Sequence, residues 1–284
     1  MNKNKNITTF IGCNSDYNEA EIVVFGAPYD GTTSNRPGTR FAPSFMRLES
    51  YALETYSPYL DKDMEDYTIF DGGDLEFPFG NTHKTLNVIY ENTMEILKDK
   101  KKPFMIGGEH LVTLGSFQAL YKHNPDICVI HLDAHTDLRE EYLGERFSHA
   151  TVMKRIHDFV GDGRIFQYGI RSGTKEEFQW AKEHISLTPF TLDGIEEATT
   201  EIGNRPVYVT IDLDVLDPSI FSGTGTIEPG GVTFKELLIA LNKIKKMNIV
   251  GADIVELSPH NDATGTSTAV ACKVMRELLL TMVK

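Results

Sequence analysis

The sequence predicts a three-layer α/β/α fold, in which a mostly parallel sheet of about eight strands lies between two layers of helices. The first reason is that short apolar segments alternate with helical patterns over almost all of the 284 residues. The second is that most of these short segments are apolar along their whole length, as strands are when helices cover both faces of their sheet.

Eight short apolar runs are predicted as strands, namely 21–25, 68–70, 104–106, 127–132, 164–169, 186–188, 207–211 and 249–255. Seven longer segments with helical patterns are predicted as helices, namely 44–53, 82–98, 111–122, 150–160, 175–183, 233–245 and 266–283. The chain contains no evident linker, repeat or low-complexity tract. We therefore predict a single domain over residues 1–284, with the polar residues 1–6 frayed.

The composition is typical of a globular protein, with 40% hydrophobic and 24% charged residues. No apolar run approaches the ~20 residues that span a bilayer, and no signal-peptide pattern is present, so we expect no membrane partner. The widely spaced Cys13, Cys128 and Cys272 are interpreted as buried free thiols, because two of them lie in apolar patterns. These observations predict a cytoplasmic protein.

The chain has 41 acidic and 28 basic residues and a formal net charge of −13. This balance disfavours nucleic acid as a partner, because phosphates attract basic surfaces. It is compatible with a cationic ligand, although many soluble proteins are acidic for solubility alone.

Polar residues gather directly after four of the predicted strands, where open α/β sheets bind their ligands. The segments PFMIGGEH, VIHLDAHTD, YVTIDLDVLDP and GADIVELSP contribute His110, Asp133, His135, Asp137, Asp212, Asp214 and Glu256. Alternate residues of an extended chain point to one side, so Asp133, His135 and Asp137 are expected to share a face. The same argument places Asp212 and Asp214 on one face.

Carboxylates crowded at neighbouring strand ends repel one another unless cations lie between them. Two imidazoles and four carboxylates, without a thiolate, suit two hard or borderline divalent ions that share bridging carboxylates. Manganese fits this set better than zinc, whose structural sites favour cysteine and histidine. Each segment alone has a plainer interpretation, such as a capping aspartate in DAHTD, and only their combination predicts a metal site.

The same segments resemble the ureohydrolase family, which includes arginases and agmatinases. The family signatures are present as GGEH, DAHTD and TIDLDVLDPSIFSGTGTIEPGG, and the resemblance runs from GAPYDGTTSNRPGTRFAP to VELSP. The segment DAHTDLREEYLGERFSHAT is most similar to bacterial agmatinases. The resemblance implies the arginase fold, two Mn²⁺ ions per subunit and assembly into homotrimers or homohexamers.

The resemblance also implies how the ligands divide between the two ions. His110 and Asp137 would bind the first ion, and His135 and Asp214 would bind the second. The two remaining carboxylates, which would bridge both ions, are Asp133 and Asp212. The chain reads TID, SGTGTI and PGTR where family members usually read SFD, PGTGTP and PGAR. We expect these departures to alter loop detail and to leave the metal ligands untouched.

By the same resemblance, His149 in FSHAT would shuttle a proton and Glu256 in VELSP would hold a guanidinium. A guanidinium is a poor electrophile, and a water that bridges two metal ions is a strong enough nucleophile near neutral pH. Glu256 can accept hydrogen bonds from the guanidinium, and an ordinary histidine titrates near neutrality. Taken alone, Glu256 would be a structural carboxylate and His149 a capping or surface residue. Together with the metal site they predict hydrolysis to urea and an amine.

The loop LREEYLGERFSH bears on the substrate. Its acidic residues Glu140, Glu141 and Glu145 suit an amine tail and disfavour the α-carboxylate of arginine. Agmatine, a small cationic guanidino compound, is therefore the expected substrate. Arg139 and Arg146 keep 4-guanidinobutyrate open as an alternative.

Two alternatives come from other classes of protein. The first is a metal-binding sensor without turnover, which the complete ligand set disfavours. The second is a metal-dependent deacetylase, which six ligands for two ions disfavour. The other polar residues receive structural interpretations: His131 as a buried core residue, Asp71 and Asp74 as turn formers, and as surface or loop residues without a metal partner His83, His123, His157, His184 and His260.

Overall fold

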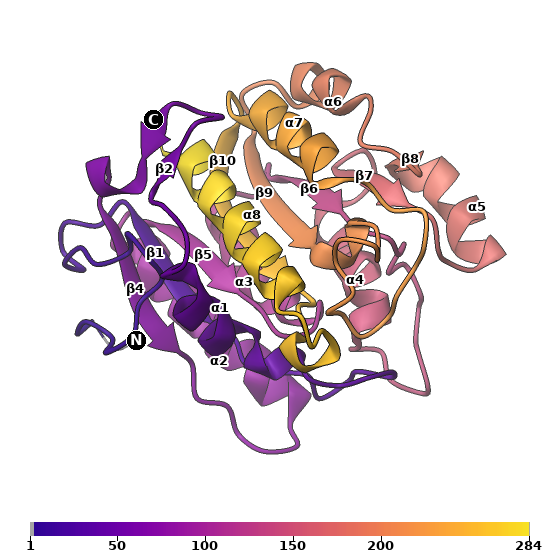
Figure 1. The fold of residues 1–284 in the computed structure, drawn as a ribbon. Helices are drawn as coiled ribbons and strands as arrows, with labels where there is room; N and C mark the ends of the chain where they lie inside the picture. Colours follow the sequence, from indigo (N-terminus) through magenta and orange to yellow (C-terminus); the bar gives the residue numbers. More distant parts are fainter. Residues whose placement is uncertain (1–2, 284) are drawn as a thin grey trace.

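The computed structural model describes residues 3–283, and one eight-stranded sheet forms its centre (Figure 1). In chain order the strands are β1 (Ile22–Gly26), β4 (Ile69–Asp74), β5 (Lys102–Ile106), β6 (Cys128–Leu132), β7 (Ile165–Ile170), β8 (Ser186–Pro189), β9 (Pro206–Asp212) and β10 (Asn248–Val255). Their spatial order is β4-β1-β5-β10-β9-β6-β7-β8, and every neighbouring pair is parallel. The predicted sheet is confirmed.

Helices cover both faces of this sheet (Figure 1). One layer contains α1 (Ala42–Ser50), α6 (Ile195–Ile202), α7 (Phe234–Ile244) and α8 (Thr266–Met282). The other contains α2 (Thr82–Lys98), α3 (Val112–His123), α4 (Val152–Val160) and α5 (Lys175–His184). Because both faces are covered, every residue of β1 and β6 is buried, which explains why these strands contain no polar residue except His131. The three-layer prediction is confirmed.

Helices α5 and α7 begin where local chemistry favours a helix start. Thr174 accepts a hydrogen bond from the amide of Glu177, whose carboxylate accepts one from the amide of Thr174. Thr233 and Glu236 repeat this reciprocal arrangement at the start of α7. Each pair satisfies amide groups that the first turn of a helix leaves without partners, so both starts agree with the predicted positions.

The sequence does not predict helix α6 or the small antiparallel hairpin of β2 (Tyr56–Ser57) and β3 (Lys62–Asp63). Helix α6 has eight residues between Gly194 and Gly203, and each hairpin strand has two. Such short elements do not establish a clear periodicity. Five 3-10 turns also lie among the described residues, at Thr39–Phe41, Met64–Asp66, His149–Thr151, Leu213–Val215 and Pro259–Asn261.

Asp71 and Asp74 are more than turn formers. Asp71 accepts a hydrogen bond from the amide of Gly73, as a turn former would, but its buried carboxylate also pairs with the Nε and Nη2 atoms of Arg47 at 2.8 and 3.0 Å. Arg47 contacts Asp74 through Nη1. These ion pairs join α1 to the edge strand β4.

The three cysteines are buried and free, as predicted. Within residues 3–283, no helix combines the length and the apolar character needed to cross a membrane. The predicted frayed start includes residues 1 and 2, which lie outside the described residues. Lys3 is described, and its ammonium forms ion pairs with Glu95 and Asp99.

The sheet order places the candidate site. Strands β5, β10, β9 and β6 are adjacent at the centre of the sheet. The polar residues of all four segments lie at or just after the carboxyl ends of these strands. In a parallel sheet these ends lie along one edge. Segments as distant in sequence as His110 and Glu256, 146 positions apart, therefore come into contact.

Candidate metal centre

The position of His110 depends on a close approach between the backbone that follows β5 and the backbone of the N-terminal loop at Tyr29. A Cβ atom on Gly108 would lie 1.9 Å from the carbonyl oxygen of Tyr29, so this position accepts only glycine. The amide of Glu109 donates to the same carbonyl oxygen at 2.8 Å. The N-terminal loop is thereby held against the end of β5, and His110 follows with its side chain buried.

The aspartate segments leave the extended conformation earlier than expected. The Asp133 carboxylate accepts a hydrogen bond from the amide of His135, and Asp212 accepts one from the amide of Asp214 at 2.9 Å. Asp137 has a left-handed backbone with a φ of 52°. The aspartates are grouped as predicted, but the predicted reason, alternation along an extended strand, was wrong. Turns closed by the aspartate side chains produce the grouping instead.

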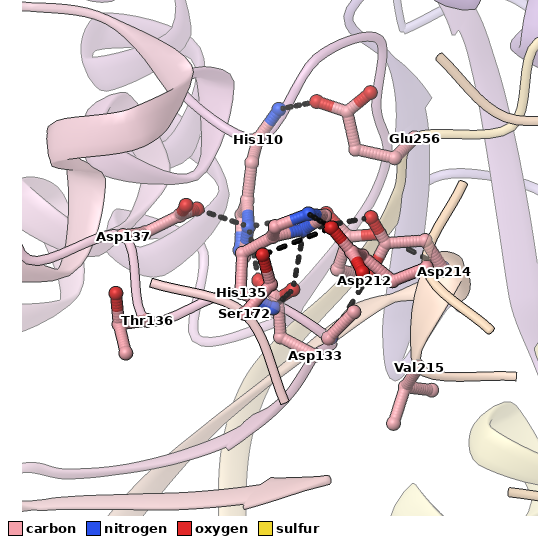
Figure 2. A network of polar contacts seen from close by, with 12 residues as sticks. His110, Asp133, His135, Thr136, Asp137, Ser172, Asp212, Asp214, Val215 and Glu256 are labelled. Atoms are coloured by element: carbon pink, nitrogen blue, oxygen red, sulfur yellow. Dashed lines mark hydrogen bonds and ion pairs between the residues drawn. The ribbon is translucent and has the colours of Figure 1, made fainter. Parts of the chain in front are cut away.

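The His110 ring faces three carboxylates (Figure 2). Its Nδ1 atom lies 3.1 Å from Oδ2 of Asp133 and 3.1 Å from Oδ2 of Asp137. The third carboxylate, Asp212, has its Oδ2 atom 3.4 Å from the same nitrogen. One imidazole nitrogen carries at most one proton, so it cannot satisfy three carboxylates.

The His135 ring forms the second half of the cluster. Its Nδ1 atom lies 3.0 Å from Oδ2 of Asp214 and 3.5 Å from Oδ1 of Asp133. Asp133 thus directs one carboxylate oxygen toward each of the two histidines. This is the geometry expected of a carboxylate shared by two neighbouring cations.

The electrostatics of the cluster favour cations. Burial and the charge of Asp133 raise the pKa of Asp137 to about 7. Burial and the neighbouring Asp214 raise the pKa of Asp212 well above its usual range. The Nδ1 atom of His110 is buried without a hydrogen-bond partner. A set of imidazole nitrogens and carboxylate oxygens fits divalent cations, which would offset this repulsion.

Further side chains orient the histidines. The Nε2 atom of His110 lies 3.1 Å from Oγ1 of Thr210, which leaves Nδ1 free to bind a metal ion. Thr210 is the first residue of the TID departure, so one departure contacts a proposed ligand, although none of the proposed ligand residues is itself replaced. His131 is buried, as predicted, and its Nε2 atom lies 2.7 Å from Oδ2 of Asp133. Gln167 contacts the other nitrogen of His131 at 2.9 Å and fixes the ring.

Glu256 and His149 line the same cavity of about 250 Å³. Oε1 of Glu256 accepts a hydrogen bond from the amide of His110 at 2.7 Å, and Glu256 has a left-handed backbone with a φ of 66°. Such strain in a non-glycine residue is typical of functional sites. Burial, followed by the charge of Glu109, raises the pKa of Glu256. Burial lowers the pKa of His149 to about 4, so its ring is neutral at pH 7.

Residues 20–281 match the arginase family. The chain belongs to the arginase family. It is 47% identical over 279 residues to the agmatinase of Bacillus anthracis, covering 97% of this chain and 96% of that protein. It is 46% identical over 280 residues to the agmatinase of Bacillus subtilis, with 97% and 96% covered. A crystal structure of a Clostridium difficile protein, provisionally named an agmatinase, has a TM-score of 0.92 and 57% identity, with 94% of this chain and 98% of that chain covered.

These similarities identify the chain as an agmatinase-like ureohydrolase with the arginase fold. The two groups of side chains able to hold a metal ion at its sheet edge both include Asp133. One group adds His110 and His131, and the other adds His135 and Asp214. The segments predicted from the sequence are therefore brought together in a family of metal-dependent hydrolases.

The sequence did not predict that Thr32 and Glu109 support His149 in this ureohydrolase. Oγ1 of Thr32 donates to the buried carboxylate of Glu109 and accepts a hydrogen bond from the amide of His149 at 3.1 Å. The amide of Thr32 also donates to Glu109, at 2.8 Å. Burial raises the pKa of Glu109 to about 7, against the opposing effect of these hydrogen bonds. Glu109 stands within GGEH, but nothing in that motif indicates a contact with the N-terminal loop.

The glutamates of the loop LREEYLGERFSH do not lie beside the substrate, where the predicted preference for an amine tail would require them. Neither Glu140 nor its neighbours Glu141 and Glu145 line the cavity, and Glu140 pairs with Arg155 and Lys154. Arg139 does line the cavity. In contrast, Arg146 pairs with Asp158 and is not among the cavity-lining residues.

A further carboxylate that lines the cavity is Glu228, from the glycine-rich loop of the third signature, and its side chain is about one-third exposed. Its Oε1 atom accepts a hydrogen bond from Ser172 at 2.9 Å and lies 3.9 Å from Nε2 of His135. Arg171 donates two hydrogen bonds to the backbone carbonyl oxygen of Glu228 and fixes the loop. No role was predicted for this acidic residue from the sequence.

Proposed function

We propose that this ureohydrolase converts agmatine to putrescine and urea with two Mn²⁺ ions per subunit. Two histidines and four aspartates converge beside Glu256, and this observation carries the proposal. Relatives named agmatinase align over nearly the whole chain and support the same substrate.

We assign His110 and Asp137 to the first metal ion and His135 and Asp214 to the second, with the bridging carboxylates from Asp133 and Asp212. The split contacts of Asp133 with both histidines support this division. When bound, two such cations lower the pKa of water by several units and supply a nucleophile near neutral pH. Four carboxylates for two imidazoles favour the harder Mn²⁺ over Zn²⁺.

Glu256 would bind and orient the guanidinium, whose planar N–H groups match a carboxylate acceptor. Because Glu256 is buried, a cationic substrate would offset the cost of its ionised form. The Nδ1 atom of His149 is buried without a hydrogen-bond partner, and its Nε2 atom lies 3.3 Å from Oγ of Ser34. A neutral ring with one unpaired nitrogen can accept a proton there and pass it to the departing amine.

Glu228 supports agmatine over arginine. Its carboxylate lines the cavity and would attract the terminal ammonium of agmatine and repel the α-carboxylate of arginine. Arg139 lines the same cavity, but its Nε atom lies 3.8 Å from the carboxylate of Glu177, which offsets part of its charge. A substrate with a carboxylate tail, such as 4-guanidinobutyrate, would have to compete for Arg139.

The proposal is tested with Asp133→Asn and Asp212→Asn. Each replacement removes one anionic oxygen from a bridging position, so bound manganese and urea release should be lost together. His123→Gln is the matched control, because this exposed histidine lies outside the cavity. Undiminished activity in either aspartate variant would refute the assignment. Full metal binding without urea release by the wild type would favour the sensor.

The family resemblance further supports a homotrimer or homohexamer and a cytoplasmic location as proposals. Light scattering coupled to gel filtration measures the assembly directly. A monomer at micromolar concentration would contradict the proposed assembly.

A further inference from the structure

A second cluster of metal-binding side chains lies outside the candidate active site. It consists of His157 on α4, Asp162 in the turn after α4, and His184 at the end of α5. None of the three lines the active-site cavity. The prediction that His157 and His184 lack a metal-binding partner was therefore wrong, because it considered spacing along the chain and not in space.

The two imidazoles converge on one carboxylate oxygen. Nε2 of His157 and Nδ1 of His184 each lie 2.8 Å from Oδ1 of Asp162. A tetrahedral zinc ion holds nitrogen and oxygen ligands at about 2.0–2.1 Å, which separates neighbouring ligand atoms by roughly 3.3 Å. The two nitrogens and the oxygen lie within 4.8 Å of one another, and a shift of the Asp162 oxygen by about 0.5 Å would give it this spacing from each nitrogen. Asp162 is exposed and can make this movement.

The backbone holds the cluster in place. Gly161 donates its amide to the carbonyl of His157 at 2.9 Å, and Gly163 donates to the carbonyl of His184 at 3.0 Å. Both glycines have left-handed backbones, with φ values of 71° and 69°, so the tight turn that presents Asp162 depends on them. The turn thus joins the ends of two helices.

Trp180 fixes both rings. It stacks on His184 with centroids 4.4 Å apart and meets His157 edge-on at 4.6 Å. Rings held in position lose little conformational entropy when they bind a ligand, so the site is preorganised. Among the described residues, Lys154 makes the one cation–π contact with Trp180. Its ammonium also pairs with the carboxylates of Asp158 and Glu140.

We propose that His157, Asp162 and His184 form a surface binding site for one Zn²⁺ ion, with water as the fourth ligand. Two imidazoles and one carboxylate with an open position are a common zinc ligand set. This set binds Mn²⁺ weakly, because Mn²⁺ stands at the low end of the affinity order for such ligands. The two sites of the protein therefore differ in metal preference.

The site also has a structural consequence. Helix α4 follows the turn that carries His149, and Glu177 of α5 accepts hydrogen bonds from Thr136 and Leu138 in the aspartate loop. A metal ion at the far ends of α4 and α5 would tie together the two helices that support the active-site loops. Zinc should therefore raise the unfolding temperature of the manganese-loaded protein.

Trp180 is the only tryptophan in the chain and reports on this site directly. Titration of manganese-loaded protein with Cu²⁺, a quencher that takes the same ligands, should quench its fluorescence with saturation near one equivalent. A large excess of Zn²⁺, which binds such ligands less tightly than Cu²⁺, should reverse the quenching. In His157→Gln and His184→Gln the apparent Kd should rise more than about 100-fold, because even outer-shell partners contribute 10–100-fold. His123→Gln should behave as the wild type.

Two further readouts keep the test independent of folding and of the proposed reaction. In the double variant, which combines His157→Gln and His184→Gln, bound zinc measured after gel filtration should fall by one ion per chain. Bound manganese and urea release should stay unchanged. Circular dichroism checks that each variant is folded. Equal quenching and equal zinc content in the wild type and the folded double variant would overturn the proposal. So would zinc binding by the wild type only at millimolar concentration.

Discussion

Thr32→Val tests whether the N-terminal loop positions His149. Valine keeps the shape of threonine but removes the hydroxyl group that donates to Glu109 and accepts from the amide of His149. A hydrogen bond to a charged group contributes about 1.5–3 kcal/mol. If this energy is lost in the transition state, kcat should fall about 10- to 100-fold, at 1.36 kcal/mol per tenfold.

The assay is urea release from manganese-loaded enzyme over a range of agmatine concentrations, with bound manganese measured on the same samples. Thr32→Ser is the matched control, because serine keeps the hydroxyl, and it should retain most of the activity. The metal content of Thr32→Val should equal that of the wild type, since Thr32 contacts none of the proposed ligands in the hydrogen bonds described. Wild-type kcat in Thr32→Val would refute the positioning role, and loss of manganese would show that the loop supports the metal ligands instead.

Three other replacements have distinct expected effects. Glu228→Gln should raise KM for agmatine about tenfold with little change in kcat, because it removes ground-state attraction for the ammonium; an unchanged KM in steady-state kinetics would contradict this role. The pKa of His149 is lowered to about 4, so its ring stays neutral above that pH. In His149→Asn the rate should therefore fall, while the pH–rate profile from pH 6 to 9 keeps the shape of the wild-type profile. A wild-type limb near pH 6.5 that disappears in the variant would argue against the lowered pKa. Arg47→Met leaves the buried Asp71 carboxylate without its partner and should lower the free energy of unfolding by about 3–5 kcal/mol in urea titrations; a loss below about 1 kcal/mol would show that the pair contributes little.

The strands and the ligand segments were predictable because their signals are local. A strand buried on both faces favours apolar residues along its whole length, and β6 has them at every position except His131. The polar residues that follow are conspicuous, because a buried carboxylate such as Asp133 is costly without a partner. Local signals also marked the starts of α5 and α7.

The parts that escaped prediction depend on direction and on tertiary contact. The charges of the loop with Glu140 were visible in the sequence, but charge alone does not say that this exposed side chain pairs with Arg155 outside the cavity. Glu228 was hidden in a glycine-rich segment whose course is set by Arg171. His157 and His184 meet only because a turn with two left-handed glycines joins the ends of two helices.

We propose that the cluster at the sheet edge hydrolyses the guanidinium of an amine-tailed substrate. The most direct measurement is urea release by the manganese-loaded protein when it is offered agmatine, arginine and 4-guanidinobutyrate in parallel. We expect agmatine to turn over far faster than the other two, because Glu228 lines the cavity and would attract its terminal ammonium. Faster turnover of 4-guanidinobutyrate would instead assign recognition of the tail to Arg139, and no urea from any of the three with two metal ions bound would contradict the proposed reaction.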